Sequence, residues 1–239
     1  MKRLNEKVAI VTGSSSGIGK AIALKFGEEG ATVVVAARRL ELCEQVAERI
    51  RDRGGDAVAM RTDVTDDAQV DALLSHTISH YGRLDILVNN AGVFGGGPLM
   101  NTSTAQFDHV LNTNLRGTFF CCRAAMRIMV KQRAGVIINM SSVAGIDAWA
   151  GTGTYSASKH GLMGLTKALA DEARGHGIKV CAICPAGVAD ELVDASDKEI
   201  LKSQKISPFD IAETALFLST LGPHAIVRQV VVDRLGAEW

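Results

Sequence analysis

The chain has 239 residues, of which 47% are hydrophobic and 22% are charged, enough to build one large core. Its 26 Lys and Arg residues balance its 26 Asp and Glu residues, which argues against a protein that binds nucleic acid or a membrane surface. No stretch approaches the roughly 18 apolar residues of a membrane span, and no signal-peptide pattern is present, so we expect a cytoplasmic protein. The length suits a single domain over residues 1–239.

Short β-branched runs alternate with longer segments of helical periodicity along the whole chain. The runs that predict strands lie at 8–12, 32–37, 57–61, 85–89, 135–140, 178–184 and 226–232. The segments that predict helices lie near 17–29, 39–53, 66–80, 103–132, 153–176 and 208–220. Several strands are apolar at consecutive positions, which indicates a parallel sheet covered on both faces. The pattern predicts an α/β fold of the Rossmann type, a doubly wound sandwich whose central parallel sheet has about seven strands with helices on both faces.

A glycine-rich segment, VAIVTGSSSGIGKAIA, joins the first predicted strand to the first helix. Its glycines allow a tight turn, a close approach of a cofactor and close packing of the helix, and the free N–H groups at the helix start suit a pyrophosphate. Because the motif follows a strand and opens a helix, it predicts dinucleotide binding, with a merely flexible loop as the alternative. The cofactor contacts of this segment are expected at Gly13, Ser15, Ser16, Gly17, Ile18 and Gly19.

The end of the second predicted strand, in VVVAARRLE, bears on which dinucleotide binds. A carboxylate there would bind the ribose 2′-hydroxyl of NAD(H) and repel a 2′-phosphate. The sequence instead has Ala37, followed by Arg38 and Arg39, whose guanidinium groups suit a phosphate. We therefore expect NADP(H), with NAD(H) less favoured and Arg38 as the main contact; two solvated arginines are the alternative. Asp63 is expected either to accept a hydrogen bond from the adenine amino group or to serve as a turn residue.

The segment TYSASKHG places Tyr155 and Lys159 four residues apart, on one face of a predicted helix. A nearby ammonium favours the phenolate form of a tyrosine. Lowering the phenol pKa by about three units takes roughly 4 kcal/mol, which Lys159 and an oxidised nicotinamide are expected to supply. Tyr155 would then donate a proton to a carbonyl oxygen in reduction and accept one in oxidation. Ser142 or Ser141, after the fifth strand, would hold the substrate oxygen, and spacing alone does not choose between them.

The five cysteines show no disulfide framework, although Cys181 and Cys184 form a C-x-x-C. That pair lies in an apolar strand, where residues three apart face opposite ways, so both are expected to be buried. The histidines show no metal-ligand spacing such as H-E-x-x-H, and no metal is predicted.

Taken together, TGSSSGIG at 12–19, NNAG at 89–92 and the Y-x-x-x-K of Tyr155 resemble the motifs of the short-chain dehydrogenase/reductase family, over nearly the whole chain. The resemblance implies that Asn114, in LNTNLRG, is the asparagine that holds a proton-relay water. It also selects Ser142, thirteen residues before Tyr155, over Ser141. Lys159 would bind the nicotinamide ribose as well. Further cofactor contacts are expected at Val64, Asn90, Ala91, Gly92, Pro185 and Val188.

Two segments depart from the family pattern. After the sixth strand the family usually has P-G-x-V-x-T, whereas this chain has PAGVAD, with Asp190 where the threonine contacts the nicotinamide carboxamide. Asp190 would accept a hydrogen bond from that carboxamide or recognise a cationic substrate. Near the C-terminus the usual T-G-Q and V-D-G-G are altered, so the family's common homotetramer and a homodimer both stay open.

A short, mostly polar loop at about 187–206 is expected to cover the substrate, which favours a small or medium, partly polar molecule over a bulky steroid. The expected substrate contacts are Ser142, Phe94, Ile146, Trp149 and Asp190. These residues predict an oxidoreductase that moves a hydride between NADP(H) and a carbonyl or alcohol, with Asn114, Ser142, Tyr155 and Lys159 as the catalytic set. The alternative is a dinucleotide-binding redox sensor without turnover, which would be expected to lose the tyrosine or the lysine.

Overall fold

A computed structural model describes residues 2–194, 196, 199 and 203–235. Within these residues, seven strands form one parallel sheet in the order β3-β2-β1-β4-β5-β6-β7, which confirms the predicted α/β Rossmann-type fold. The strands are β1 (Val8–Thr12), β2 (Thr32–Ala37), β3 (Asp56–Arg61), β4 (Ile86–Asn89), β5 (Gly135–Met140), β6 (Ile178–Pro185) and β7 (Gln229–Val232).

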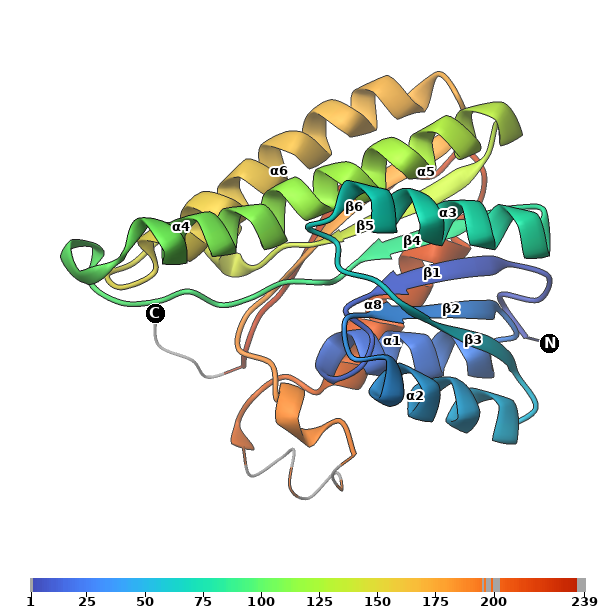
Figure 1. Cartoon of the computed structure of the whole chain (residues 1–239), viewed down its shortest axis with the longest axis horizontal. Coiled ribbons are helices and arrows are strands. Elements are labelled where there is room, and N and C mark those ends of the chain that lie inside the picture. The colour runs from blue at the N-terminus through green and yellow to red at the C-terminus, as the bar shows by residue number, and fades with distance from the viewer. Residues whose placement is uncertain (1, 195, 197–198, 200–202, 236–239) are drawn as a thin grey trace.

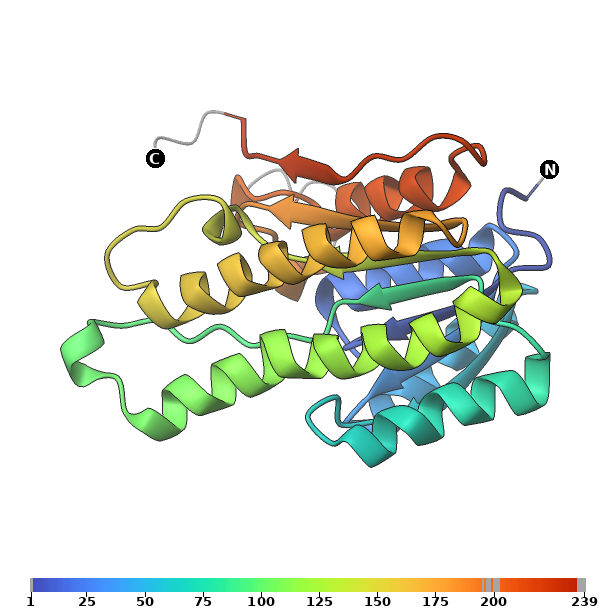
Figure 2. The same cartoon turned by 90° about the horizontal axis from the view of Figure 1, so that it is seen from above.

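Helices cover both faces of the sheet (Figures 1 and 2). One layer holds α1 (Gly17–Glu28), α2 (Leu40–Asp52) and α8 (Pro208–Thr220). The other holds α3 (Asp67–Tyr81), α4 (Thr104–Leu111), α5 (Thr118–Gln132) and α6 (Gly153–Arg174). Short 3-10 turns lie at η1 (Leu99–Asn101), η3 (Val143–Gly145) and η4 (Asp190–Leu192). No helix among the described residues is both long enough and apolar enough to cross a bilayer.

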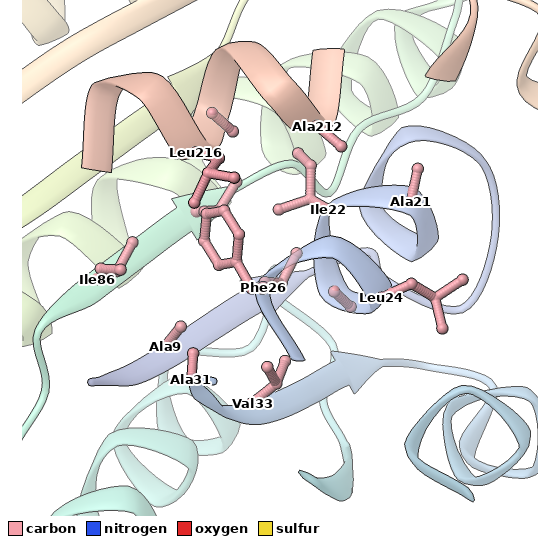
Figure 3. Close-up of a cluster of buried hydrophobic side chains, with 14 of the residues drawn as sticks. Ala9, Ala21, Ile22, Leu24, Phe26, Ala31, Val33, Ile86, Ala212 and Leu216 are labelled. Atoms are coloured by element: carbon pink, nitrogen blue, oxygen red, sulfur yellow. The ribbon is translucent and has the colours of Figure 1, made fainter. Parts of the chain in front are cut away.

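Two large hydrophobic clusters, one on each face, hold the helices to the sheet. On the α1 side, Phe26 is fully buried and lies between the strands and α8, close to Leu216 (Figure 3). The cysteines of the C-x-x-C follow the predicted alternation, since Cys181 joins this cluster while Cys184 packs with Met163 of α6 on the opposite face. This packing fixes the strand ends that carry the polar residues described below.

The segment predicted as one helix over 103–132 is divided by a π-helical turn, η2 (Asn112–Gly117), between α4 and α5. Ser103 and Gln106 form a capping box that starts α4, as helix N-termini require. The wider turn is typical of functional sites, and it carries Asn114.

The last strand is shorter than the predicted 226–232. The chain reaches the sheet edge only at Arg228, whose carbonyl accepts a hydrogen bond from the N–H of Ala182, and the ladder with β6 then runs over Gln229–Val232. Ile226 lies before the ladder and is exposed. The prediction failed here because an apolar run does not show where the chain first meets its partner strand.

All seven strands are parallel, so their carboxyl ends meet at one edge. The strand order reverses between β1 and β4, and an open α/β sheet binds its ligand at such a switch point. The loops after β1 and β4 therefore bound the expected site.

Candidate active site

A cleft of about 730 Å³ opens at the carboxyl edge of the sheet. It is lined by nearly all of the residues predicted from the sequence, although these come from seven different segments of the chain. The predicted residues that line it are Gly13, Ser15, Ser16, Gly17, Ile18, Arg38, Arg39, Asp63, Val64, Asn90, Ala91, Gly92, Phe94, Ser142, Tyr155, Lys159, Pro185, Val188 and Asp190.

The glycine-rich loop is fastened to the end of β4 by hydrogen bonds. Asn90 donates from Nδ2 to the carbonyls of Thr12 (3.1 Å) and Gly13 (3.3 Å), and the Thr12 hydroxyl accepts from the N–H groups of Asn90 and Ala91. Gly13 has a positive φ of 65°, and a Cβ there would lie 2.7 Å from the Ala91 backbone, so glycine is required. The NNAG segment thus sets the shape of the loop.

The two arginines after β2 differ in their contacts. Arg39 donates to the hydroxyls of Ser15 (3.0 Å) and Ser16 (2.9 Å), which joins a guanidinium to the hydroxyl groups of the glycine-rich loop. This arrangement forms a donor cluster that suits a phosphate. Arg38 is the main contact expected from the sequence; it lines the cleft, but Arg39 is the arginine held against the serines. Residue order along a strand end does not show which of two adjacent side chains turns inward.

Asp63 forms a local turn at the end of β3. Its Oδ1 accepts hydrogen bonds from the N–H of Thr65 (3.0 Å) and from the Thr65 hydroxyl (2.8 Å). Of the two roles expected from the sequence, the structure shows the turn residue. The second carboxylate oxygen leaves room for an adenine contact, because Asp63 lines the cleft.

Tyr155 and Ser142 meet at the cleft from α6 and from the end of β5. The Ser142 hydroxyl lies against Tyr155, where it favours the phenolate, and it also lies 3.4 Å from the Pro185 carbonyl. Ser141 borders the cleft too, but its side chain is buried next to Gly145. The two serines therefore have different environments, and the hydroxyl placed beside the phenol belongs to Ser142.

The chain's own groups raise the pKa of Tyr155 above its ordinary value of 10. Burial is the largest cause; the hydrogen bond with Ser142 opposes it, and the negative charge of Asp190 adds to it. Lys159 is not among the causes of this shift in the chain alone, so the lowering expected from Lys159 together with an oxidised nicotinamide stays a prediction. The Lys159 ammonium lies 5.6 Å from the Tyr155 ring centroid and donates to the Met140 carbonyl at 2.8 Å.

Lys159 is 5% exposed, and burial lowers its pKa to about 8. Gly92 opens the space beside it, since a Cβ at Gly92 would lie 3.7 Å from the lysine Nζ. An ammonium has three donors, and Met140 takes one of them. The others are available for ribose hydroxyls at the floor of the cleft.

Asn114 lies behind the cleft surface and is 1% exposed. Its Oδ1 accepts from the N–H of Val93 (2.8 Å), and its Nδ2 donates to the Val93 carbonyl and the Ser158 hydroxyl, both at 3.0 Å. The asparagine thus fixes the loop after β4 and the helix that carries Tyr155 relative to each other. Its Oδ1 would also lie 3.3 Å from a Cβ on Gly92, close to the lysine.

A family model described as short chain dehydrogenase matches residues 7–200. The chain belongs to the short-chain dehydrogenase/reductase family. Members of this family are NAD(P)-dependent oxidoreductases, and so is this chain.

Curated proteins and solved structures give the same result. The chain is 40% identical over 235 residues to the 3-oxoacyl-[acyl-carrier-protein] reductase FabG of Staphylococcus aureus strain Mu50, covering 94% of this chain and 95% of that protein. It is 39% identical over 201 residues to the 3beta-hydroxysteroid dehydrogenase of Mediterraneibacter gnavus, covering 84% of this chain and 72% of that protein. A metagenomic short-chain oxidoreductase in complex with NADP superposes with a TM-score of 0.86 at 36% identity, over 98% of this chain and 99% of that one.

Within this family fold, four predicted residues do not line the cleft: Gly19, Asn114, Ile146 and Trp149. Gly19 packs against Gly13 and Asn90, as its predicted role in helix packing requires. Ile146 and Trp149 lie on the exposed segment after β5, with Trp149 49% exposed. A hydrogen bond from the Gly97 N–H to the Gly151 carbonyl (2.7 Å) joins that segment to the loop that carries Phe94.

Asp190 stands where the family usually has a threonine, and its carboxylate reaches α1. Its Oδ1 accepts a hydrogen bond from the N–H of Ile18 at 3.0 Å, at the N-terminus of α1. The carboxylate therefore lies against the loop predicted to hold the pyrophosphate, while its negative charge also acts on Tyr155. Its expected contact with the carboxamide or a cationic substrate stays a prediction.

Sequence reasoning missed several residues that line the cleft. His109 and Thr113 both line it, one helical turn apart on the stretch that leads to Asn114. Their spacing of four residues places His109 and Thr113 on one face of a helix. Because Thr113 directly precedes the predicted site residue Asn114, this spacing is the signal that could have added both residues to the site. The lack of a metal-ligand pattern among the histidines does not bear on whether one of them lines a cofactor cleft.

Proposed function

We propose that the chain is an NADP(H)-dependent carbonyl reductase or alcohol dehydrogenase that acts on a small or medium substrate. The observation that carries the proposal is the placement of Ser142 next to Tyr155 and buried Lys159, in a cleft that also holds the glycine-rich loop and Arg39. The whole of residues 1–239 would act as one cofactor-binding and catalytic domain. We also propose a cytoplasmic location and a homodimer or homotetramer, as suits a member of this family.

The cofactor-binding groups fit a phosphorylated dinucleotide. Ser15, Ser16 and Arg39 would hold the 2′-phosphate, the N–H groups at the start of α1 would hold the pyrophosphate, and Lys159 would bind the nicotinamide ribose. The NADP in the complex of the metagenomic relative supports this preference. When bound, the reduced nicotinamide supplies the hydride.

The chain's own residues supply the proton and the orientation. Ser142 would hold the substrate carbonyl oxygen while Tyr155 donates its phenolic proton to that oxygen. The raised pKa of Tyr155 keeps the phenol protonated, which suits the donor role in the reductive direction. In oxidation the phenolate is needed, and the positive charge of an oxidised nicotinamide would add to that of Lys159. Asn114 would keep Tyr155 and the lysine aligned through Ser158 and Val93.

The substrate side combines an apolar wall with a polar loop. The Phe94 ring is 71% exposed and lies 5.0 Å, centroid to centroid, from the Tyr155 ring, so an apolar group next to the reacting carbonyl would pack on it. One relative is named for a 3-oxoacyl substrate, which carries a carbonyl, and another for a 3β-hydroxysteroid, which carries an alcohol. Part of the predicted substrate loop at about 187–206 lies outside the described residues, and its mostly polar sequence favours a 3-oxoacyl thioester or a small ketone over a steroid.

The test is NADPH oxidation followed by absorbance with small ketones, diketones, quinones, a 3-oxoacyl thioester and a 3-ketosteroid. Turnover of at least one carbonyl, lost in Tyr155→Phe while NADPH affinity is kept, supports the proposal. Substantial residual turnover in Tyr155→Phe contradicts the role of the phenol. Tight NADPH binding without turnover of any compound favours a redox sensor instead.

A further inference from the structure

The carboxylate of Asp190 fills the place next to the glycine-rich loop where an anion of the cofactor would bind. Its Oδ1 accepts a hydrogen bond from the Ile18 N–H at 3.0 Å. The same oxygen lies 2.7 Å from the position of a Cβ on Gly17, whose φ is 54°. Gly17 therefore lets the carboxylate approach the helix end as closely as a phosphate oxygen would.

Asp190 begins a short acidic strap, residues 190–194, that is held down at both ends. Asp194 forms ion pairs with Lys20 Nζ (2.5 Å) on α1 and with Arg49 (2.6 Å) on α2. At the base of the strap, Val188 pairs with Ile206, and Glu191 forms an ion pair with Lys205 at 2.7 Å. The hydrogen bond from Ile18 to Asp190 is thus one of several contacts that hold residues 190–194 against the protein. The ion pairs of Asp194 with α1 and α2 are the others at the far end of the strap.

A pyrophosphate and the Asp190 carboxylate cannot both use the Ile18 N–H. Two anions at this distance also repel each other, and the cleft excludes part of the water that would screen them. We propose that Asp190 is a built-in competitor for the cofactor's pyrophosphate, so that a dinucleotide binds only when the carboxylate leaves the N-terminus of α1 and the strap moves with it. This inference rests on the proposed dinucleotide binding and adds a residue that sets its affinity.

The charge balance around Asp190 agrees with this role. The residue as a whole is exposed, but its carboxyl group packs on Gly17, and this partial burial is the main cause of a raised pKa. The hydrogen bond from Ile18 and the charge of Lys205 oppose the rise, while Glu191 adds to it. The carboxylate is therefore held at the helix end at a cost in desolvation, which makes it easier to displace than a fully satisfied one.

The experiment compares Asp190→Asn with wild type by direct binding, with no turnover involved. Three probes are titrated by calorimetry: NADPH, inorganic pyrophosphate, and adenosine 2′-monophosphate, which carries no pyrophosphate. Asp190→Asn should bind NADPH and pyrophosphate about tenfold more tightly, since it removes a charged competitor for one hydrogen-bond donor, and should bind adenosine 2′-monophosphate with nearly unchanged affinity. The cofactor-free variant should not melt at a lower temperature, because the raised pKa of Asp190 means that its charge costs the fold stability, and the Asn amide oxygen can still accept the hydrogen bond from Ile18.

Two further variants separate a local contact from general charge. Asp194→Asn leaves the cleft groups in place and loosens the strap, so it should also tighten NADPH binding, by a smaller factor. Glu191→Gln removes the same charge from the same strap, but its carboxylate pairs with Lys205, so the change in NADPH affinity should stay within about threefold.

Equal or weaker binding of NADPH and pyrophosphate by Asp190→Asn would overturn the inference while leaving the proposed function intact. A gain of the same size in Glu191→Gln would also overturn it, because the effect would then be general repulsion. Failure of both wild type and Asp190→Asn to bind any dinucleotide would overturn the proposed function and this inference with it.

Discussion

Replacement of Lys159 by methionine should stabilise the cofactor-free protein at neutral pH and lose that advantage at high pH. The lysine is buried, and its pKa falls from 10.5 to about 8 because burial disfavours the ammonium. The unfolded chain therefore binds this proton more tightly than the folded one between those two values. Stability of the wild type must then rise as pH rises through this window, whereas methionine has no proton to lose.

The size of the effect follows from the two pKa values. At about pH 7 the buried ammonium costs the wild type about 3 kcal/mol, and at about pH 9.5 the cost is about 1 kcal/mol. Loss of the hydrogen bond to the Met140 carbonyl costs the variant about 1 kcal/mol or more at every pH. Lys159→Met should therefore be more stable than wild type near neutrality by about 1–2 kcal/mol, and the difference should shrink or reverse by about pH 9.5.

The assay is urea unfolding of the cofactor-free proteins across this pH range, with the free energy difference between variant and wild type as the readout. Effects of pH on other groups cancel in that difference. Lys167→Met is the matched control, since Lys167 is exposed on the same helix. A difference between Lys159→Met and wild type that stays constant across the range would refute the lowered pKa, whatever its absolute value.

Two other predictions concern the cofactor preference and the core. Arg39→Gln should weaken NADPH binding about 10- to 100-fold and NADH binding by less than about threefold, as shown by fluorescence titration. Arg38→Gln is its control. A larger loss of NADPH affinity in Arg38→Gln than in Arg39→Gln would show that Arg38 is the main contact of the 2′-phosphate. Phe26→Ala should lower the free energy of unfolding by about 3–5 kcal/mol in denaturant melts, because it opens a cavity between α1 and α8; a loss below about 1 kcal/mol would show that the core collapses around it.

Most of the sheet could be predicted because its strands are apolar at consecutive positions and each is followed by a helical segment. The strand β2 (Thr32–Ala37) and the helix α8 (Pro208–Thr220) have the bounds that the sequence gives for them. Within the predicted helix over 103–132, the prediction failed because the pattern is too coarse. The pattern around Asn114 shows a helix, but a single inserted residue makes a π turn, and periodicity does not resolve one residue.

The candidate site was predictable to the level of segments and less so to the level of single side chains. Both arginines after β2 satisfy the charge argument, yet only the folded chain shows Arg39 against Ser15 and Ser16. Alternation along β5 could not separate Ser142 from Ser141, since their difference arises in the 3-10 turn that follows. The position of Asp190 depends on how its loop meets α1. Asp190 and its hydrogen-bond donor Ile18 are 172 residues apart in sequence, so no local pattern predicts this contact.

Lys159 and Asp190 illustrate two ways in which the cleft departs from a structure chosen for stability alone. The ammonium and the carboxylate are both charges that the cofactor-free fold holds at a cost in desolvation. Removing the first should therefore stabilise the empty protein near neutral pH, and removing the second should not destabilise it. The two changes should nevertheless act on the cofactor in opposite directions, the first by loss of a ribose contact and the second by loss of a competitor. The sign of the change in affinity, and not the change in stability, therefore distinguishes a group that serves the dinucleotide from a group that competes with it.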